Sequence, residues 1–281
     1  MTAHNEPASD TGRLPREGCS LSWHAIGAGT PVLFIHGTAA AVWGELPART
    51  ARFARTIQYD RRGFGASSAP PVATLSLHAS DAAALLQSLT TEPAVIVGWS
   101  IGGIIACELA ASHPGRVRGL VLLEPPFWAK KHPSLALLNG VLLSILLGLL
   151  AGPARGGRRF SRWVFREREG GQSLDRLPAD LRARIEANAA AIGVEIRAGT
   201  GEHLTAAQIG ELRTPTTILA GDRSRPFFEQ CAQRLAGLIP GARLVPLAGA
   251  NHLMQVDHAT AIVEAIREQI ADTVPPPPSA R

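Results

Sequence analysis

The sequence predicts an α/β protein with a mostly parallel central sheet, helices on both faces of the sheet and an inserted helical cap. Two observations support this fold class. Short, continuously apolar segments, typical of buried parallel strands, alternate along the chain with segments of helical periodicity. Such alternation implies crossover connections between parallel strands. The interval 124–213 breaks the alternation, because it is helical in pattern and contains no convincing strand.

Strand and helix patterns can be assigned in chain order. The first strand pattern alternates apolar and polar residues, and most of the others are short apolar runs bounded by turn residues. The expected strands are 19–26, 31–35, 56–59, 94–97, 117–123, 216–220 and 243–247. The expected helices outside the interval 124–213 are 75–89, with Ser76 as a candidate N-cap, 101–112, 227–239 and 252–270.

The order of these elements predicts one core that is divided by an insertion. Residues 19–123 and 214–271 are expected to form the α/β core, and residues 124–213 the helical cap. Residues 1–18 are expected to be a flexible leader. The end of the chain, 272–281, contains four consecutive prolines and is expected to be a disordered tail.

Composition narrows the class of protein. Hydrophobic residues make up 46% of the 281 residues and charged residues 18%, which excludes a mainly disordered chain. The three cysteines are odd in number and far apart, so neither a disulfide framework nor a zinc site is indicated, and no metal is expected. Residues 1–15 lack the apolar run of a secretory signal, so a cytoplasmic location is expected.

The longest apolar segment lies inside the expected cap. Residues 133–154 include no charged residue and are long enough for a membrane-spanning candidate. A single span there would put the two parts of the core on opposite sides of a bilayer, so that they could never meet. The sequence therefore favours one or two packed cap helices. It also leaves open an apolar lid that lines a substrate site or touches a membrane surface.

The segment Gly98-Trp99-Ser100-Ile101-Gly102 carries the clearest chemical signal. It fits the pattern G-x-S-x-G, with an apolar strand pattern before it and an apolar helix pattern after it. In this arrangement the serine occupies a strained strand-to-helix turn, and the small residues two positions away avoid clashes with neighbouring backbone. The Ser100 hydroxyl would project beyond the sheet edge beside a helix N-terminus, which favours developing negative charge. Ser100 is therefore the candidate nucleophile.

With two further motifs, this pentapeptide resembles the α/β-hydrolase family over roughly residues 19–271. The segment 34–38, Phe-Ile-His-Gly-Thr, is similar to the oxyanion loop of that family. The resemblance implies that the backbone N–H groups of Thr38 and Ile101 bind the oxyanion, and two such donors lower a reaction barrier by several kcal/mol.

Two more segments carry the resemblance. Gly249-Ala250-Asn251-His252 is similar to the G-x-x-H sequence before the last helix of the family, which implies that His252 is the base that activates the serine. Residues 59–65 are similar to the D-x-R-G-F-G turn of the family. That turn is expected to be structural, with Asp60 holding it through hydrogen bonds.

The acid of the implied triad is the point at which the chain departs from the family. Its usual position, three residues after the glycine that ends the penultimate strand, holds Ser224 instead of aspartate. Asp222 lies nearby but two residues early. Glu124 ends an earlier strand and is followed by two prolines, an arrangement that resembles lipases of the pancreatic type. Glu124 is favoured as the acid that orients His252, and Asp222 is the alternative.

The resemblance implies a serine hydrolase that cleaves an ester or related acyl bond of a small hydrophobic substrate through an acyl-enzyme, without a cofactor. Two other reactions use the same triad and stay open: cofactor-free perhydrolysis of the haloperoxidase type and carbon–carbon bond hydrolysis. Family members that dehalogenate or open epoxides have aspartate where this chain has Ser100. The alternative of a different class is a non-catalytic ligand-binding protein that keeps the fold.

Basic residues are concentrated in the expected cap. The net charge is +5, and residues 124–213 hold 13 basic and 9 acidic residues, so the rest of the chain is nearly neutral. A nucleic-acid face on the core is therefore not expected. Six arginines follow the apolar run and predict either a solvated face or contact with an anionic acyl carrier or membrane surface. These are Arg155, Arg158, Arg159, Arg162, Arg166 and Arg168.

Overall fold

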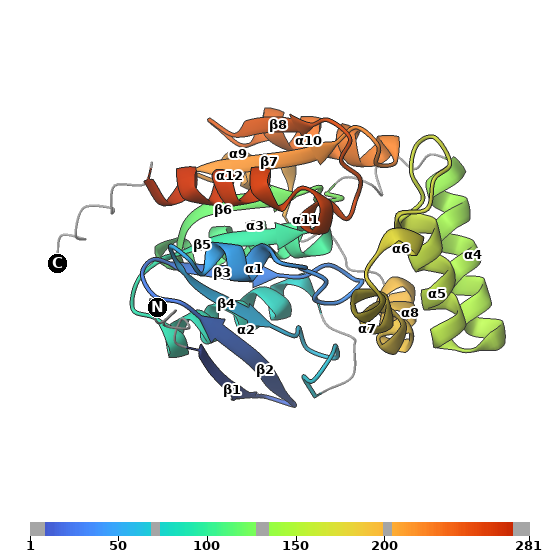
Figure 1. Ribbon diagram of the computed structural model, residues 1–281, viewed down its shortest axis with the longest axis horizontal. Helices are drawn as coiled ribbons and strands as arrows, with labels where there is room; N and C mark the ends of the chain where they lie inside the picture. The colour runs from blue at the N-terminus through green and yellow to red at the C-terminus, as the bar shows by residue number, and fades with distance from the viewer. Residues whose placement is uncertain (1–8, 69–73, 128–134, 199–203, 272–281) are drawn as a thin grey trace, which may run out of the picture.

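The computed structural model describes residues 9–68, 74–127, 135–198 and 204–271. Its centre is an eight-stranded sheet with the strand order β1-β2-β4-β3-β5-β6-β7-β8 (Figure 1). The pairs β1/β2 and β2/β4 are antiparallel, and all other neighbouring strands are parallel. The predicted fold class, a mostly parallel α/β sheet, is confirmed.

The bounds of the elements are as follows. The strands are β1 Ser9–Arg16, β2 Cys19–Ile26, β3 Pro31–Ile35, β4 Arg55–Tyr59, β5 Ala94–Trp99, β6 Val117–Leu123, β7 Thr216–Gly221 and β8 Arg243–Leu247. The helices of the core are α1 Leu46–Thr50, α2 Leu75–Leu89, α3 Ile101–Ser112, α9 Ala206–Gly210, α10 Pro226–Leu238, α11 Met254–Asp257 and α12 Ala259–Ala271, with a 3-10 turn at Pro114–Arg116. The helices of the insertion are α4 Leu135–Ala151, α5 Pro153–Val164, α6 Ser173–Arg176, α7 Ala179–Ala187 and α8 Ala189–Ala198.

Successive side chains of the central strands enter two apolar cores, one on each face of the sheet. In β3, Leu33 and Ile35 belong to a cluster with residues of α2, α3 and α10, whereas Val32 and Phe34 belong to a cluster with residues of α1 and α12. The strands β3, β5 and β7 are buried along their whole length. Their continuously apolar sequences follow from this burial on both faces.

The expectation of a flexible leader over residues 1–18 is wrong for its second part, and residues 1–8 lie outside the described residues. Ser9–Arg16 forms β1, which pairs antiparallel with β2 at the edge of the sheet. Most of its side chains are exposed, so its sequence lacks the apolar pattern of a core strand. At Gly12 a Cβ atom would lie 2.6 Å from the Trp23 ring, so the strand packs closely on its neighbour.

Two helix boundaries also differ from the expectation. The N-cap of α2 is Thr74 rather than Ser76, because the Thr74 hydroxyl accepts the N–H of Leu77, while Ser76 donates to Glu108. The helix expected over 252–270 is divided into α11 and α12 by His258, whose backbone is not helical.

The insertion stands at one end of the sheet, with α4 and α5 as its outermost helices (Figure 1). Helix α9, which the sequence placed in the cap, packs instead on α3 and α10, and its Ile209 belongs to one of the two core clusters. In the described chain, the helices of the insertion that stand apart from the sheet are α4 to α8, and they are called the cap below. Among the described helices none is long and apolar enough to cross a membrane.

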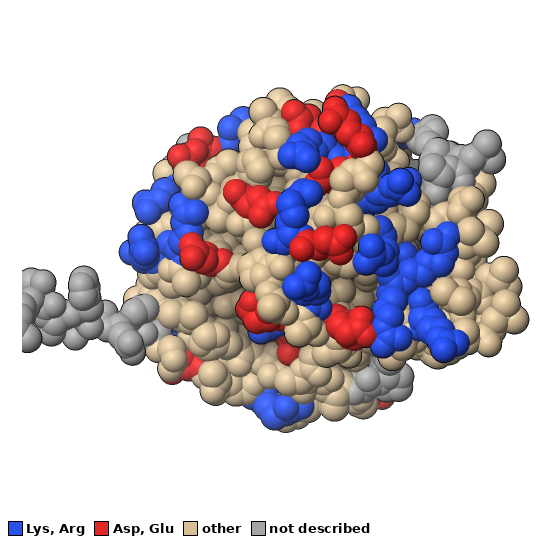
Figure 2. Space-filling model, turned by 45° about the vertical axis from the view of Figure 1, so that its right-hand side comes forward, with Lys and Arg blue, Asp and Glu red and all other residues tan. Residues whose placement is uncertain are grey.

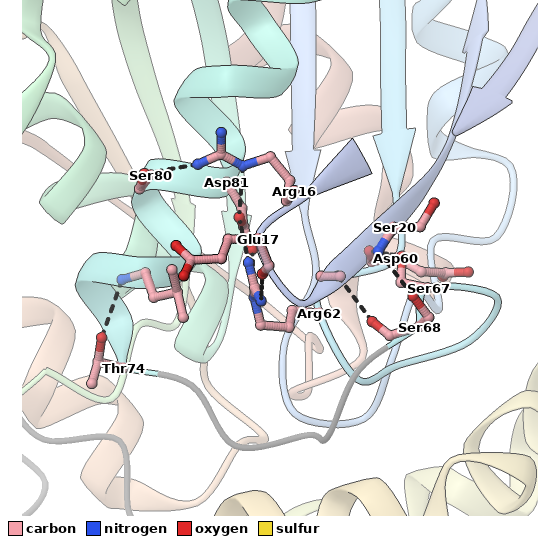
Figure 3. A network of polar contacts seen from close by, with 12 residues as sticks. Arg16, Glu17, Ser20, Asp60, Arg62, Ser67, Ser68, Thr74, Ser80 and Asp81 are labelled. Atoms are coloured by element: carbon pink, nitrogen blue, oxygen red, sulfur yellow. Dashed lines mark hydrogen bonds and ion pairs between the residues drawn. The ribbon is translucent and has the colours of Figure 1, made fainter. Parts of the chain in front are cut away.

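A buried ion pair between Arg62 and Asp81 connects the turn after β4 to α2 (Figure 3). The Arg62 Nε and Nη2 atoms each donate to the Asp81 carboxylate at 2.9 Å. Arg16 of β1 donates to the same carboxylate at 3.1 Å. Asp60 accepts the N–H of Ala66 at 2.8 Å, so it holds the turn as the sequence predicted. This network connects the turn to α2 and to the edge strand β1, and so supports the fold.

Candidate active site

The residues singled out by the motifs follow the carboxyl ends of neighbouring parallel strands. His36 follows β3, Ser100 follows β5, Glu124 follows β6 and Asp222 follows β7. These strands are adjacent in the order β3-β5-β6-β7, so their ends lie along one edge of the sheet. In open α/β sheets this edge is where ligands bind.

Ser100 occupies a strained turn between β5 and α3. Its backbone angles are φ 54 and ψ −126, and its N–H donates to the carbonyl of Leu123 at 2.8 Å. The glycines of the motif are required by space: a Cβ on Gly102 would lie 2.0 Å from the carbonyl oxygen of Ile35, and one on Gly98 would lie 2.6 Å from Gly103 Cα. The chain can therefore make this turn only with glycine at both positions, as the motif predicted.

His252 is held among aromatic rings beside the end of β5. The Phe228 ring stacks on the imidazole with a centroid distance of 3.8 Å, and the Trp99 ring lies 5.6 Å away. The indole N–H of Trp99, the residue before Ser100, donates to the backbone carbonyl of His252 at 2.8 Å. Only 3% of His252 is exposed. A hydrogen bond therefore joins the loop that contains His252 to the end of β5, directly before Ser100.

Glu124 contacts His252 through a short hydrogen bond. Its Oε2 atom lies 2.6 Å from His252 Nδ1, and its side chain is fully buried. Two further donors hold the carboxylate: the N–H of Gly221 at 2.8 Å and the hydroxyl of Ser224 at 2.9 Å. An ionised carboxylate only accepts hydrogen bonds, so Nδ1 carries the proton and Nε2 is left free to accept one.

Ser224 is a contact that the sequence did not identify. It occupies the position where the family has its acid, and its hydroxyl supports the carboxylate of Glu124 instead. The backbone of Glu124 has a φ of 46, an unusual conformation for a residue with a Cβ. This conformation brings the side chain of Glu124 across from β6 to the loop after β7.

Asp222 has a different environment. Its side chain accepts the N–H of Gly249 at 2.8 Å and is exposed to solvent. It thus connects the loop after β7 to the loop after β8, which is the backbone-capping role often found for carboxylates in turns. The carboxylate that accepts the hydrogen bond of His252 belongs to Glu124.

The loop after β3 lies against Ser100. A Cβ atom on Gly37 would lie 2.9 Å from Ser100 Cβ, so glycine allows the two segments to approach. His36 is fully buried, accepts the N–H of Arg61 on Nε2 at 2.9 Å and contacts the carbonyl oxygen of Gly37 through Nδ1 at 2.7 Å. Burial, with the neighbouring Arg61 charge, lowers the pKa of His36 well below its usual value, so the ring is neutral. His36 therefore supports the loop through these two hydrogen bonds.

Arg61 is a functional candidate that sequence analysis missed. Its guanidinium is fully buried and pairs with Glu195 of α8 in the cap, at 2.8 Å from Nη1 and 3.3 Å from Nη2. Nη2 also donates to the carbonyl oxygen of Gly37 at 3.2 Å, and Nη1 lies 3.0 Å from His78 Nε2. Burial and the adjacent Arg61 lower the pKa of His78, so it is neutral as well. The signal for Arg61 in the sequence is its place in the turn 59–65, which is expected to be structural.

These contacts fix the orientation of one peptide group. In a trans peptide the carbonyl of Gly37 and the N–H of Thr38 point in opposite directions. Because Arg61 and His36 hold the carbonyl on their side, the N–H of Thr38 is turned away from them. The geometry thus presents a fixed backbone donor in the loop that touches Ser100, and links it to the cap through Glu195.

A strained serine at a strand-to-helix turn and a buried carboxylate–histidine pair on an eight-stranded, mostly parallel sheet define a class of protein. The model of the Alpha/beta hydrolase family matches residues 32–265, and the chain belongs to this family.

Relatives within this class have different named activities. The chain is 29% identical over 266 residues to a 2-hydroxymuconate semialdehyde hydrolase of Pseudomonas sp. (strain CF600), covering 91% of this chain and 92% of that protein. It is 28% identical over 273 residues to a pimeloyl-[acyl-carrier protein] methyl ester esterase of Aeromonas hydrophila, covering 88% and 98%. A hydrolase from Pseudomonas aeruginosa PA01 has a similar solved structure, with a TM-score of 0.76, 26% identity and coverage of 96% and 99%.

Proposed function

We propose that this protein is a serine hydrolase that cleaves an ester or related acyl bond through Ser100, His252 and Glu124. The observation that carries the proposal is the 2.6 Å contact between Glu124 and His252 Nδ1, beside a serine held in a strained turn. A serine hydroxyl is a weak nucleophile until a base accepts its proton, and the pair leaves His252 Nε2 free for that role.

The expected reaction has two stages. Ser100 Oγ attacks the acyl carbon while His252 accepts its proton, and Glu124 stabilises the resulting imidazolium without taking the proton itself. The N–H groups of Thr38 and Ile101 bind the oxyanion of the tetrahedral intermediate. His252 then protonates the leaving group, and water activated by the same histidine releases the acyl group from Ser100.

The surroundings of His252 favour a hydrophobic substrate. Rings of Trp99, Phe165 and Phe228 lie 5.6, 6.0 and 3.8 Å from the imidazole, measured between centroids. Apolar side chains near the reacting group match an apolar acyl or alcohol portion. The esterase among the relatives agrees with an ester substrate.

A fluorophosphonate probe tests the proposed nucleophile. Wild-type protein is expected to be labelled with one probe per chain, and Ser100→Ala is expected to lose the label. Ser112→Ala is a matched control, because Ser112 lies at the other end of the same helix α3, and this variant should be labelled normally. An unreactive wild-type protein would favour the non-catalytic alternative, and labelling that persists in Ser100→Ala would place the nucleophile elsewhere.

A second candidate is carbon–carbon bond hydrolysis on the same three residues. It is favoured by the similarity to a hydrolase whose named substrate is a semialdehyde rather than an ester. Comparing kcat/KM for p-nitrophenyl esters of increasing acyl length with kcat/KM for 2-hydroxymuconate semialdehyde distinguishes the two. For an ester hydrolase, we expect kcat/KM to be higher for the esters than for the semialdehyde and to rise with acyl length. A higher kcat/KM for the semialdehyde would favour carbon–carbon bond hydrolysis.

A further inference from the structure

One helix of the cap carries most of the exposed apolar surface of the described chain. Seven large apolar side chains are exposed among the described residues, and six of them lie on α4. Their exposed fractions range from 40% to 77%. The six are Leu138, Leu142, Leu143, Leu146, Leu149 and Leu150. A continuous apolar patch of this kind marks an interaction surface rather than ordinary surface variation.

The opposite side of α4 explains why the leucines face outward. Gly140, Ser144 and Gly148 are spaced four residues apart and form the side that meets α5. A Cβ atom on Gly140 would lie 2.0 Å from the Trp163 ring, and one on Gly156 would lie 2.9 Å from Gly148 Cα. The two helices are thus in close contact through small residues. The leucines, on the far side, do not contribute to this packing.

Positive charge lies next to the leucines. Helix α5 exposes Arg155, Arg158 and Arg162, and the chain after it exposes Arg166 and Arg168. Figure 2 shows basic side chains gathered beside an uncharged surface on the cap side of the molecule. Arg158, Arg162 and Arg168 form ion pairs with Glu186, Asp175 and Glu229, but these pairs are solvent-exposed and hold the arginines only weakly.

Acidic residues within α4, α5 and the residues directly after them do not balance this positive charge. Between residues 135 and 168 the sequence has one acidic residue, Glu167. Its side chain is buried and bound by Arg176, Arg223 and Ser173. The outer surface of α4 and α5 is therefore apolar on one side and cationic on the adjoining side.

We propose that this surface docks on an anionic lipid bilayer. Helix α4 has 17 residues, roughly 25 Å, and would lie in the plane of the membrane with its leucines among the acyl chains. The arginines of α5 would contact the lipid phosphates, which lie nearer the membrane surface than the acyl chains. This partner fits both parts of the surface, because the leucines match the hydrocarbon layer of the bilayer and the arginines match its phosphate layer.

Two other partners fit less well. In a two-fold contact between copies of this chain through α4, the α5 arginines of both copies would approach each other. An acidic partner such as an acyl carrier protein would match the arginines, but gives no reason for six exposed leucines. Both partners therefore predict different results from the bilayer in the same experiment.

Co-sedimentation with vesicles tests the proposal independently of any enzymatic activity. The full chain is mixed with phosphatidylcholine vesicles that contain or lack phosphatidylglycerol. Wild-type protein should bind the anionic vesicles at least about tenfold more tightly than the neutral ones, and added salt should weaken the binding. Leu142→Gln/Leu146→Gln/Leu149→Gln and Arg155→Gln/Arg158→Gln/Arg162→Gln should each lose about tenfold or more in affinity.

Leu77→Gln is the matched control, since among the described residues Leu77 is the exposed leucine that lies outside α4, at 38%. It should bind vesicles like the wild type. The proposal is wrong if wild-type protein does not bind, if neutral vesicles bind equally well, or if the leucine variant binds unchanged. A dimer in sedimentation velocity that dissociates in the leucine variant, without vesicle binding, would assign the surface to a second copy. Binding to an acidic carrier protein that needs only the arginines would assign it to that partner.

Discussion

Replacing Glu124 by glutamine is expected to lower kcat by about 10³- to 10⁴-fold. Glu124 accepts from His252 Nδ1, the N–H of Gly221 and the hydroxyl of Ser224, so its charge is aimed at the imidazole. Glutamine keeps the shape of the side chain but can present an amide N–H to Nδ1. That contact favours the tautomer whose Nε2 is already protonated, and such a histidine cannot accept a proton from Ser100.

Asp222→Asn is the matched control for this variant. Asp222 accepts only the backbone N–H of Gly249 among the contacts of the described chain, and an asparagine oxygen can accept the same hydrogen bond. We expect kcat close to that of the wild type. Steady-state kinetics on a p-nitrophenyl ester distinguishes Glu124 from Asp222 as the acid. Urea unfolding verifies that both variants are folded. A large loss in Asp222→Asn with little change in Glu124→Gln would move the acid to Asp222.

Removing the buried pair Arg61–Glu195 is expected to lower kcat by about 10²-fold with little change in KM. The pair holds the carbonyl of Gly37 and so fixes the N–H of Thr38, which is proposed to bind the oxyanion only once charge develops. Loss of a donor that acts in the transition state lowers kcat rather than substrate affinity. Because a single substitution would leave one buried charge unpaired, the variant is Arg61→Met/Glu195→Met.

The neighbouring pair provides a control with the same chemistry. Arg62 and Asp81 also form a buried bidentate pair from the same turn, but contact α2 and β1 rather than the loop after β3 (Figure 3). Arg62→Met/Asp81→Met should therefore affect the unfolding free energy and leave kcat nearly unchanged. Equal losses of kcat in both double variants would mean that Arg61 has only a structural role, and an unchanged kcat for Arg61→Met/Glu195→Met would exclude it as a positioning residue.

Sequence patterns predicted the buried strands and the turn at Ser100, because burial and backbone strain restrict which residues can stand at each position. The strands around the site are buried on both faces, so their apolar runs are visible in the sequence. The strained turn at Ser100 requires glycine at positions 98 and 102, which leaves a recognisable spacing. The edge strand β1 was missed for the opposite reason, because a mostly exposed strand needs no apolar pattern.

Contacts between distant segments leave a weaker signal: the sequence favoured Glu124 as the acid only through a resemblance, and it did not identify the pair Arg61–Glu195. The choice between Glu124 and Asp222 depends on the backbone of Glu124, with its φ of 46, and on Ser224, 100 residues later. Arg61 and Glu195 are 134 residues apart and lie in different parts of the fold. The sequence around Arg61 and Glu195 gives no sign of their pairing, and the prolines after Glu124 do not show which histidine it contacts. The arrangement of the strands and cap brings these residues together.

The central claim is that Ser100 forms a covalent acyl-enzyme. Its most direct test is to mix wild-type protein with a p-nitrophenyl ester, quench with acid within the first turnover and map the acyl group by peptide mass spectrometry. We expect a burst of p-nitrophenol together with one acyl group on the peptide that contains Ser100. An acyl group on another residue, or turnover without a burst and without any acylated peptide, would contradict it.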